Sequence, residues 1–303
     1  MISIPETVIE KIGFAVGEKI LDVATLVSPE TIAATGFKTQ HVTEKTLFEM
    51  VREAIADLGE FDHSQIGGVI AATFSNEERF PALAVRVATE IGIEGCGVPA
   101  YDIQMACSAY PYALMAATRL AADTGKKVLV IDADIQSRYA KSAATRAVMG
   151  DAATATIVSA QKDGKSYYDF FSRADDALCC RDEIAMDGFK VFSFVAREVS
   201  GWLKEFIARL GEGERDFQFV PHQANMYMVR QLADALGLKD RLVGSGEKYA
   251  NTGSSSASLS MADGFPVEQG KREPVLIAGF GAGLSAGVAA TTIGEYRKGV
   301  VEI

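Results

Sequence analysis

Three side chains that could carry out chemistry stand where a predicted strand gives way to a helix or a small-residue turn. Cys107 follows the apolar run 97–105, His222 follows the short strand 217–220, and Asn251 lies in a loop rich in glycine and serine. In parallel α/β sheets such corners gather at the carboxyl edge of the strands, where ligands bind. The three residues are therefore expected to converge, and a thiolate beside an imidazole is an activated nucleophile.

The segment around Cys107 favours a reactive thiol. Alanines recur at helical spacing from residue 109 to residue 116, Pro111 fits the first turn of a helix, and Gly125 ends it. A thiol at the start of a helix lies at the positive end of the macrodipole, which favours the thiolate. The alternative is that Cys107 is a small buried hydrophobic residue, as free cysteines often are. Position alone leaves both interpretations open.

The elements before and after Cys107 indicate an α/β fold. Helices are predicted over residues 43–58 and 81–91, and near-continuous apolar strands over residues 66–74, 128–133 and 152–159. Alternating strands and helices of this kind predict a mostly parallel sheet covered on both faces. The first 40 residues show no clear pattern.

The same plan repeats after the polar segment 161–165. A helix is predicted over 191–210, a strand over 218–220, a helix over 226–236, and closing strands over 275–278 and 287–293. The Ala/Thr-rich stretch 150–157 resembles 286–293. The sequence therefore predicts a duplicated α/β unit, with residues 1–160 carrying the thiol and residues 161–303 carrying the imidazole and the carboxamide.

Composition excludes several classes of protein. The chain has 303 residues, 48% of them hydrophobic, and a net charge of -10 without a dense basic stripe, which argues against nucleic-acid binding. Four cysteines without framework spacing indicate reduced thiols in the cytoplasm, with Cys179 and Cys180 as packing residues. No signal peptide is apparent. We expect neither a metal nor a cofactor.

One uncharged stretch, residues 275–294, could be taken for a membrane helix or a dinucleotide-binding unit. It contains five glycines, which predict a buried strand, a glycine turn and a second strand instead. Only 20 residues follow Gly283, too few for a βαβ unit with a ribose-binding acid. We therefore reject both the membrane-helix and the dinucleotide-binding hypotheses, and we expect no membrane span.

Several blocks of the sequence together resemble β-ketoacyl-acyl-carrier-protein synthase III, a condensing enzyme of the thiolase fold. The similarity begins near Thr35 and runs to the C-terminus. It implies a thiolase-like duplicated fold, with two mixed, mostly parallel sheets and helices in αβαβα layers. The proline-histidine-glutamine-alanine-asparagine block is the most specific; the matching segments are 35–37, 80–81, 106–110, 150–151, 186–192, 220–225, 249–253 and 279–283.

This resemblance implies a decarboxylative condensation. Cys107 would take up an acyl group as a thioester, and His222 and Asn251 would hydrogen-bond the carbonyl of a malonyl-type thioester while it loses carbon dioxide. The carbanion would then attack the acyl-Cys107 carbonyl. The resulting oxyanion would be held by the backbone N–H groups of Cys107 and Ala282.

The resemblance also implies partners. The acyl donor would be an acyl-coenzyme A or an acyl-carrier protein, and the extender a malonyl-type thioester. Phe80 would line the acyl pocket across the interface of a cytoplasmic homodimer in a fatty-acid or specialised lipid or polyketide pathway. Met149 and Phe189 are the other residues expected to bind substrate.

The chain departs from the family in ways that bear on substrate. The tryptophan and arginine that grip coenzyme A have no counterpart in residues 28–34, and Tyr227 replaces an arginine linked to carrier-protein docking. The usual first strand is predicted to be short or rearranged. These differences favour a specialised relative. Outside the site, Trp202 is predicted to pack in the core, and His41 and His63 to be solvated.

Three alternatives remain from the sequence. The same fold could transfer the Cys107 acyl group to an amine, a hydroxyl or a carrier without condensation, or serve as a non-catalytic subunit of a condensing complex. Cys, His and Asn in this order also describe papain-like hydrolases. Those enzymes lack the α/β alternation and the late glycine turn, which disfavours that class.

Overall fold

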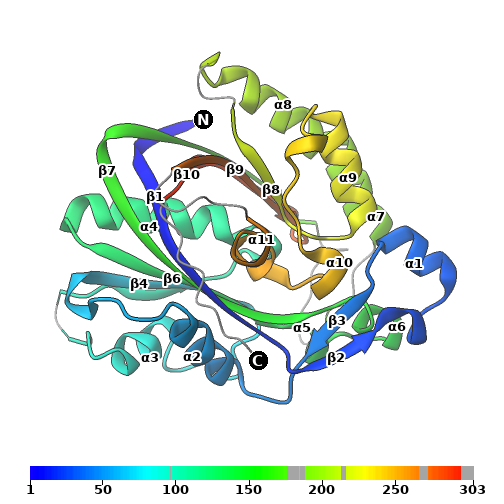
Figure 1. Cartoon of the computed structure of the whole chain (residues 1–303), viewed down its shortest axis with the longest axis horizontal. Coiled ribbons are helices and arrows are strands. Elements are labelled where there is room, and N and C mark those ends of the chain that lie inside the picture. The colour runs from blue at the N-terminus through cyan, green and yellow to red at the C-terminus, as the bar shows by residue number, and fades with distance from the viewer. Residues whose placement is uncertain (96, 176–183, 185–187, 213–215, 266–271, 295–303) are drawn as a thin grey trace.

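The computed structural model describes residues 1–95, 97–175, 184, 188–212, 216–265 and 272–294, which form one large sheet surrounded by helices (Figure 1). The sheet has the strand order β5-β4-β6-β7-β1-β10-β9-β8, and β2 and β3 pair separately. The strands are β1 (Ile2–Val16), β2 (Lys19–Asp22), β3 (Thr39–Val42), β4 (Ile66–Ala72), β5 (Ala100–Ile103), β6 (Lys127–Ile135), β7 (Asp151–Ser172), β8 (Gln218–Pro221), β9 (Glu273–Gly281) and β10 (Ser285–Ile293).

The helices divide into an inner layer and two outer layers. The inner helices α4 and α11 share one core with strands from both halves of the sheet. The core beneath α2 and α3 covers one outer face, and the core beneath α7, α8 and α9 covers the other. The helices are α1 (Pro29–Thr35), α2 (Leu47–Asp57), α3 (Leu83–Glu90), α4 (Ala109–Thr124), α5 (Gln136–Tyr139), α6 (Ala143–Arg146), α7 (Gly188–Phe194), α8 (Ser200–Arg209), α9 (Met226–Ala235), α10 (Gly246–Tyr249) and α11 (Ser256–Gly264).

This αβαβα layering confirms the predicted fold class, although the two sheets are joined into one. The strand that joins them is β7, 22 residues long, whose first part pairs with β6 and whose last part pairs with β10. Figure 1 shows β7 and β1 running together through the middle of the molecule. The segment 161–165, predicted as a polar connection, lies inside β7 at a register shift opposite Pro5 and Glu6.

Parallel pairing is less extensive than expected. It is found for β4 with β5 and β6, for β8 with β9, and over a short stretch for β1 with β10. The strand β7 is antiparallel to β6, β1 and β10. A near-continuous apolar strand reflects burial on both faces, and burial does not fix strand direction.

The first strand is also longer than predicted. β1 spans 15 residues and buries Ile4, Val8, Ile9 and Ile12. Its pairing with β7 shifts register twice, between Pro5 and Glu6 and between Ile9 and Lys11. These bulges break the strict alternation by which a strand is recognised, and they explain why the prediction of a short first strand is wrong.

The helices predicted with bounds are present, with small differences at their ends. Thr46 caps α2 through a capping box with Glu49, although residues 43–45 stay outside the helix. The predicted helix 191–210 is observed as α7 and α8 joined by a π-helical turn, Val195–Val199. Trp202 packs against the core on that side, as expected.

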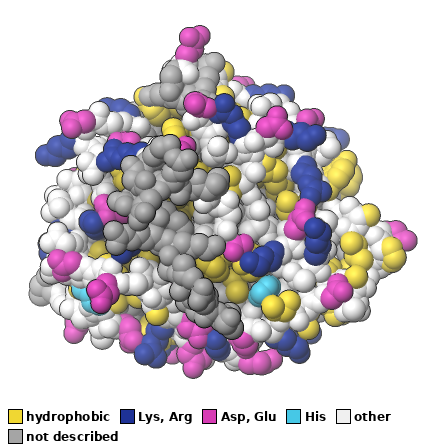
Figure 2. Space-filling view, viewed as in Figure 1, with side chains coloured by type: hydrophobic (Ala, Val, Ile, Leu, Met, Phe, Trp, Pro, Cys, Tyr) yellow, Lys and Arg dark blue, Asp and Glu magenta, His cyan; other side chains and the backbone are white. Residues whose placement is uncertain are grey.

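The stretch 275–294 forms the hairpin of β9 and β10, which confirms the strand, turn and strand that its glycines predict. No helix among the described residues is both long and apolar enough to cross a bilayer. On the face shown in Figure 2, basic and acidic side chains are interspersed.

The prediction of solvated histidines is right for His63 and wrong for His41. His63 is exposed. His41 is buried on β3, where its Nδ1 lies 3.0 Å from the carbonyl oxygen of Gly17 and its ring meets Tyr249 edge-on. Tyr249 helps to cover a residue whose surroundings in sequence, Thr39, Gln40 and Thr43, are mostly polar. Burial lowers the pKa of His41.

Candidate active site

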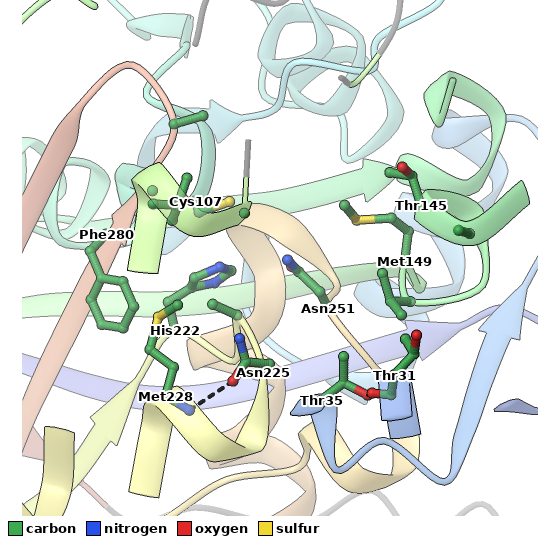
Figure 3. Close-up of a pocket in the computed structure, with 17 residues that line it drawn as sticks. Thr31, Thr35, Cys107, Thr145, Met149, His222, Asn225, Met228, Asn251 and Phe280 are labelled. Atoms are coloured by element: carbon green, nitrogen blue, oxygen red, sulfur yellow. Dashed lines mark hydrogen bonds between the residues drawn. The ribbon is translucent and has the colours of Figure 1, made fainter. Parts of the chain in front are cut away.

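A cavity of about 320 Å³ brings the three predicted residues together. Its lining includes Cys107, His222 and Asn251, and Figure 3 shows their side chains converging from three different segments. Thr31 and Thr35 of α1 and residues of the α6 region form the other side of the cavity. The convergence predicted from the positions of these residues at separate corners is confirmed.

Cys107 lies on the 3₁₀ turn Ala106–Ser108, which leads directly into α4. Its side chain is half-buried. Ala106 has a φ of 45°, a left-handed conformation that non-glycine residues seldom adopt. Ser108, the residue after Cys107, anchors the turn. Its hydroxyl donates to the Met105 carbonyl oxygen (2.8 Å) and lies 2.7 Å from Ser285 Oγ. The thiol is thus held at the N-terminal end of a 16-residue helix, where the macrodipole favours a thiolate.

The end of β9 packs directly behind this thiol. A Cβ at Gly281 would lie 2.9 Å from the Cys107 Cβ and 3.3 Å from its Sγ, and one at Gly279 would lie 2.7 Å from the Ser108 Cα. Both positions therefore need glycine for a close backbone approach. The following residue, Ala282, lines the cavity beside Cys107.

His222 is buried at the end of β8 and is held on several sides. Its backbone N–H donates to the Ala278 carbonyl (2.7 Å), its Nδ1 lies 2.6 Å from Ser256 Oγ, and its ring meets Phe280 edge-on. Burial lowers its pKa to about 3, and a backbone contact with Gly253 opposes this to a smaller extent. The imidazole is therefore neutral at physiological pH.

Asn251 is fixed through both its backbone and its side chain. Its carbonyl oxygen accepts from Gly150 N and Gln136 Nε2, and its own N–H donates to the Val148 carbonyl. Its Oδ1 accepts the Gly253 N–H at 3.0 Å and is 3.5 Å from Gln136 Nε2. Because the oxygen is occupied in this way, the Nδ2 donor faces the cavity (Figure 3).

The residue before Asn251 is as constrained as the residue before Cys107. Ala250 has φ 59° and ψ −153°, a region that is otherwise almost confined to glycine. In the part of the chain that the structure describes, Ala106 and Ala250 are the two non-glycine residues with positive φ. Each directly precedes a predicted site residue, so backbone strain is concentrated at this cavity.

Three residues that support the site were not found from the sequence. They are Gln136, Ser256 and Asp134. The Asp134 carboxylate accepts hydrogen bonds from the backbone N–H and the hydroxyl of Ser254 and from the backbone N–H of Phe74. Burial raises the pKa of Asp134 to about 6, and these hydrogen bonds oppose that rise. A carboxylate next to the last residue of the mostly apolar strand β6 was the signal available in the sequence.

The predicted substrate-binding residues are placed differently from one another. Met149 lines the cavity. Phe80 and Phe189 lie on the surface, with 90% and 77% of their area exposed, and neither is among the cavity-lining residues. Cys96, Cys179, Cys180, Met186 and Asp187 lie outside the described residues.

The cavity lining offers hydrogen-bonding groups and no fixed charge. Among its described residues there is no lysine, arginine, aspartate or glutamate, and burial keeps His222 neutral. No group of three or more described His, Cys, Asp or Glu residues is arranged to hold a metal ion. The chemistry that these groups support is nucleophilic attack by a thiolate and stabilisation of negative charge on oxygen by neutral donors.

Comparison with known proteins gives a consistent result. Residues 101–176 match the model of 3-oxoacyl-[acyl-carrier-protein] synthase III, and residues 213–293 match that of its C-terminal region. The chain is 31% identical over 281 residues to the β-ketoacyl-[acyl-carrier-protein] synthase III of Neisseria gonorrhoeae, covering 84% of this chain and 87% of that protein.

Solved structures agree in fold over nearly the whole chain. The β-ketoacyl-[acyl-carrier-protein] synthase III of Thermus thermophilus superposes with a TM-score of 0.84 at 26% identity, covering 95% of this chain and 99% of that one. The priming β-ketosynthase of the R1128 polyketide pathway superposes with a TM-score of 0.82 at 25% identity, covering 96% and 98%.

Proposed function

The chain belongs to the β-ketoacyl-[acyl-carrier-protein] synthase III family, and we propose that Cys107, His222 and Asn251 carry out its condensing reaction in this cavity. The observation that carries the proposal is the convergence of one thiol and two neutral hydrogen-bond donors in a site whose described lining has no fixed charge. Family members of this kind join an acyl group to a malonyl-type thioester and serve fatty-acid or polyketide synthesis.

In the first half-reaction, the Cys107 thiolate attacks the carbonyl carbon of an acyl thioester. The new C–S bond forms as the old one breaks, and the donor leaves as a thiolate that takes up the proton released when Cys107 ionised. The helix α4 supplies the activation, because the pKa of His222, about 3, makes the imidazole a weak base toward a thiol.

In the second half-reaction, a malonyl-type thioester loses carbon dioxide. The breaking C–C bond leaves its electron pair in an enolate, whose oxygen would accept hydrogen bonds from His222 and from the Asn251 Nδ2. Buried neutral donors suit this task, because they stabilise the developing charge without reorganising. The Asn251 amide is already oriented for it by Gly253 and Gln136.

The enolate carbon then attacks the acyl-Cys107 carbonyl. A C–C bond forms, a tetrahedral oxyanion develops, and the C–S bond breaks to release the β-ketoacyl product and regenerate the thiolate. We assign the oxyanion to the backbone N–H groups of Cys107 and Ala282. The close packing of Gly281 against the Cys107 side chain supports this assignment.

We further propose that the protein acts as a cytoplasmic homodimer. Phe80 is a large hydrophobic side chain that a single chain leaves 90% exposed, and contact with a partner would remove that apolar area from water. We propose that it enters the acyl cavity of the partner subunit. A half-buried catalytic thiol also suits a reducing compartment.

The acyl donor is either coenzyme A or a carrier protein. The threonines that line the cavity opposite the three catalytic side chains, Thr31, Thr35 and Thr145, suit the amide groups of a pantetheine arm, which both donors share. The described part of the lining has no lysine or arginine to pair with the additional phosphates that distinguish coenzyme A from a carrier-bound arm. We therefore propose the carrier-bound acyl group as the preferred donor of this divergent member.

Mass spectrometry of the intact protein tests the proposal. Incubation with a panel of acyl-coenzyme A and acyl-carrier donors should add one acyl mass to the parent protein and none to Cys107→Ala. Addition of malonyl-carrier protein should then release carbon dioxide and discharge the adduct. Equal labelling of both proteins would overturn the assignment of Cys107, and discharge to an acceptor without carbon dioxide would indicate simple acyl transfer.

A further inference from the structure

The three histidines of this chain differ in the hydrogen-bond partner of their Nδ1 atoms. His41 Nδ1 lies 3.0 Å from the Gly17 carbonyl oxygen, and His63 Nδ1 lies 2.9 Å from the Ile91 carbonyl oxygen. A carbonyl only accepts hydrogen bonds, so both of these rings must carry a proton on Nδ1. His222 is different, because its Nδ1 lies 2.6 Å from the hydroxyl of Ser256, which can donate or accept.

The contacts of Ser256 indicate which way this hydrogen bond runs. Two other buried serines of the same segment donate their hydroxyl protons to backbone carbonyls: Ser255 donates to Thr252 at 2.8 Å, and Ser258 donates to Ser255 at 3.0 Å. Ser256 instead accepts the N–H of Gln223 at 3.2 Å. Its hydroxyl proton is then directed at the nearest remaining acceptor, His222 Nδ1.

A second group, the Gly253 backbone, also interacts with the His222 ring. A hydrogen bond between the Gly253 backbone and the imidazole raises the pKa of His222. A carbonyl that accepts a ring N–H has this effect, because it stabilises the protonated ring. The Gly253 carbonyl also accepts the Ser256 N–H, so it lies beside Ser256. Two opposing influences therefore act on the ring: the Gly253 carbonyl favours a ring proton beside it, and the Ser256 hydroxyl favours an unprotonated Nδ1.

We propose that Ser256 is a positioning residue, whose hydroxyl donates to His222 Nδ1 and so places the proton of the neutral imidazole on Nε2. The condensation proposed above needs this tautomer, because only a protonated Nε2 can donate to the thioester oxygen. The inference rests on that proposed function for its catalytic consequence, whereas the tautomer itself can be observed without substrate.

Replacing Ser256 should reverse the tautomer. In Ser256→Ala the Gly253 carbonyl becomes the partner of Nδ1, the proton moves there, and Nε2 becomes an acceptor that faces the enolate oxygen with a lone pair. Ser256→Thr retains the hydroxyl and should retain the tautomer. Ser260→Ala is a matched control, because Ser260 is also buried on α11 and bonds Ser245 and the Ser256 carbonyl oxygen.

Nitrogen-15 NMR of histidine-labelled protein measures this directly. With three histidines in the chain, His222→Gln assigns the relevant signals. The two-bond proton–nitrogen pattern should show His222 protonated on Nε2 in the parent, Ser256→Thr and Ser260→Ala, and on Nδ1 in Ser256→Ala. His41 and His63 provide internal references for the Nδ1-protonated pattern. A parent His222 protonated on Nδ1, or an unchanged pattern in Ser256→Ala, would overturn the proposal.

The two half-reactions give the functional readout. Ser256→Ala should lower malonyl decarboxylation by about 10-fold to 100-fold, less than removal of a donor altogether because the ring can regain the productive tautomer. Acylation of Cys107 should change less than about threefold, since it depends on α4. An equal loss in both half-reactions would show a general structural defect. A tautomer switch in a protein whose parent releases no carbon dioxide would refute the condensing function while leaving the role of Ser256 intact.

Discussion

Two corners of the molecule have the same backbone arrangement but differ in the burial and hydrogen bonding of the side chain that each one presents. The nucleophile corner, residues 105–109, and the donor corner, residues 250–256, each contain an alanine with positive φ, a 3₁₀ turn and the start of a buried inner helix. In the first, the reactive side chain is half-buried at a helix end. In the second, Asn251 is buried within a network of hydrogen bonds.

In the mechanism proposed above, this difference separates the two half-reactions physically. A nucleophile must reach an incoming thioester, so it needs access and a favourable potential more than rigid bonding. Donors that stabilise an enolate need fixed positions and exclusion of water, and the burial of Asn251 and His222 suits the role proposed for them. Changes at the donor corner should therefore alter decarboxylation alone, and changes at the nucleophile corner should alter acylation and everything after it.

The largest effect is expected when the donor corner is given a charge. Asn251→Asp places a carboxylate where negative charge develops, and should lower decarboxylation by more than about 1000-fold, whereas Asn251→Ala removes only a donor and should cost about 100-fold. Acylation of Cys107 should persist in both. Rates of carbon dioxide release and of acyl transfer to the protein measure the two effects, and loss of acylation in Asn251→Ala would contradict the separation.

The burial of His222 should appear as a loss of stability in acid. Its pKa is about 3 in the folded protein and near 6.5 when unfolded, so the unfolded chain binds an additional proton below pH 6.5. The free energy of unfolding should thus fall by up to about 1.4 kcal/mol per pH unit from this group as pH decreases from 6.5. Denaturant unfolding of the parent and of His222→Gln between pH 7 and 5 compares the slopes.

His41 is the control for this measurement, because burial lowers its pKa with the same sign. A His41→Gln variant should lose its own contribution and retain that of His222. Identical slopes in the parent and in His222→Gln would show that His222 titrates normally, and the argument for a neutral donor would fail.

A buried carboxyl beneath the two corners should have the opposite pH dependence. Asp132 on β6 is fully buried, and neither of its oxygens has a hydrogen-bond partner among the described residues. Burial, together with the charge of Asp134, raises its pKa well above the usual range. The folded protein thus retains a proton that the unfolded chain releases, and its stability falls as pH rises above about 4.

Removing the ionisable group should therefore stabilise the protein. Asp132→Asn is expected to raise the free energy of unfolding by about 2 kcal/mol at pH 8 and to make little difference near pH 4. Asp134→Asn provides the contrast, because that carboxylate accepts several hydrogen bonds, and its loss should destabilise. A destabilised Asp132→Asn at pH 8 would show that the carboxyl has a partner in solution.

The smallest effect concerns the strained alanine of the nucleophile corner. Glycine tolerates the φ of 45° at Ala106, so Ala106→Gly should raise the free energy of unfolding by about 1 kcal/mol. Ala122→Gly, an exposed position inside α4, should lower it by about as much. Thermal unfolding compares the two, and the same sign for both would argue against strain at Ala106.

The corners were predictable from the sequence, and their supporting contacts were not. Cys107 and His222 each follow a short strand and precede a helix, a pattern carried by neighbouring residues. Gln136 bonds Asn251 across 115 residues, and no local pattern records such a pair. Ser256 was one serine in a run of three, and only its distance to the imidazole distinguishes it.

The sheet shows the same limit. The strands near the corners were found because most of their residues are apolar, as in β6 and β9. The long central strand β1 was missed because Pro5 and two bulges break its periodicity. The unity of the sheet was missed because segment 161–165 is polar, although the strand simply bulges there and continues.

The continuity of β7 has a consequence for how the molecule can be divided. A cut after residue 160 would pass through the middle of this strand, and each fragment would expose unpaired backbone groups along a fresh edge. The inner helices also contact strands from both sides of that cut. Separately expressed fragments should therefore be insoluble alone and recover activity only when refolded together, and the intact chain should melt in a single calorimetric transition.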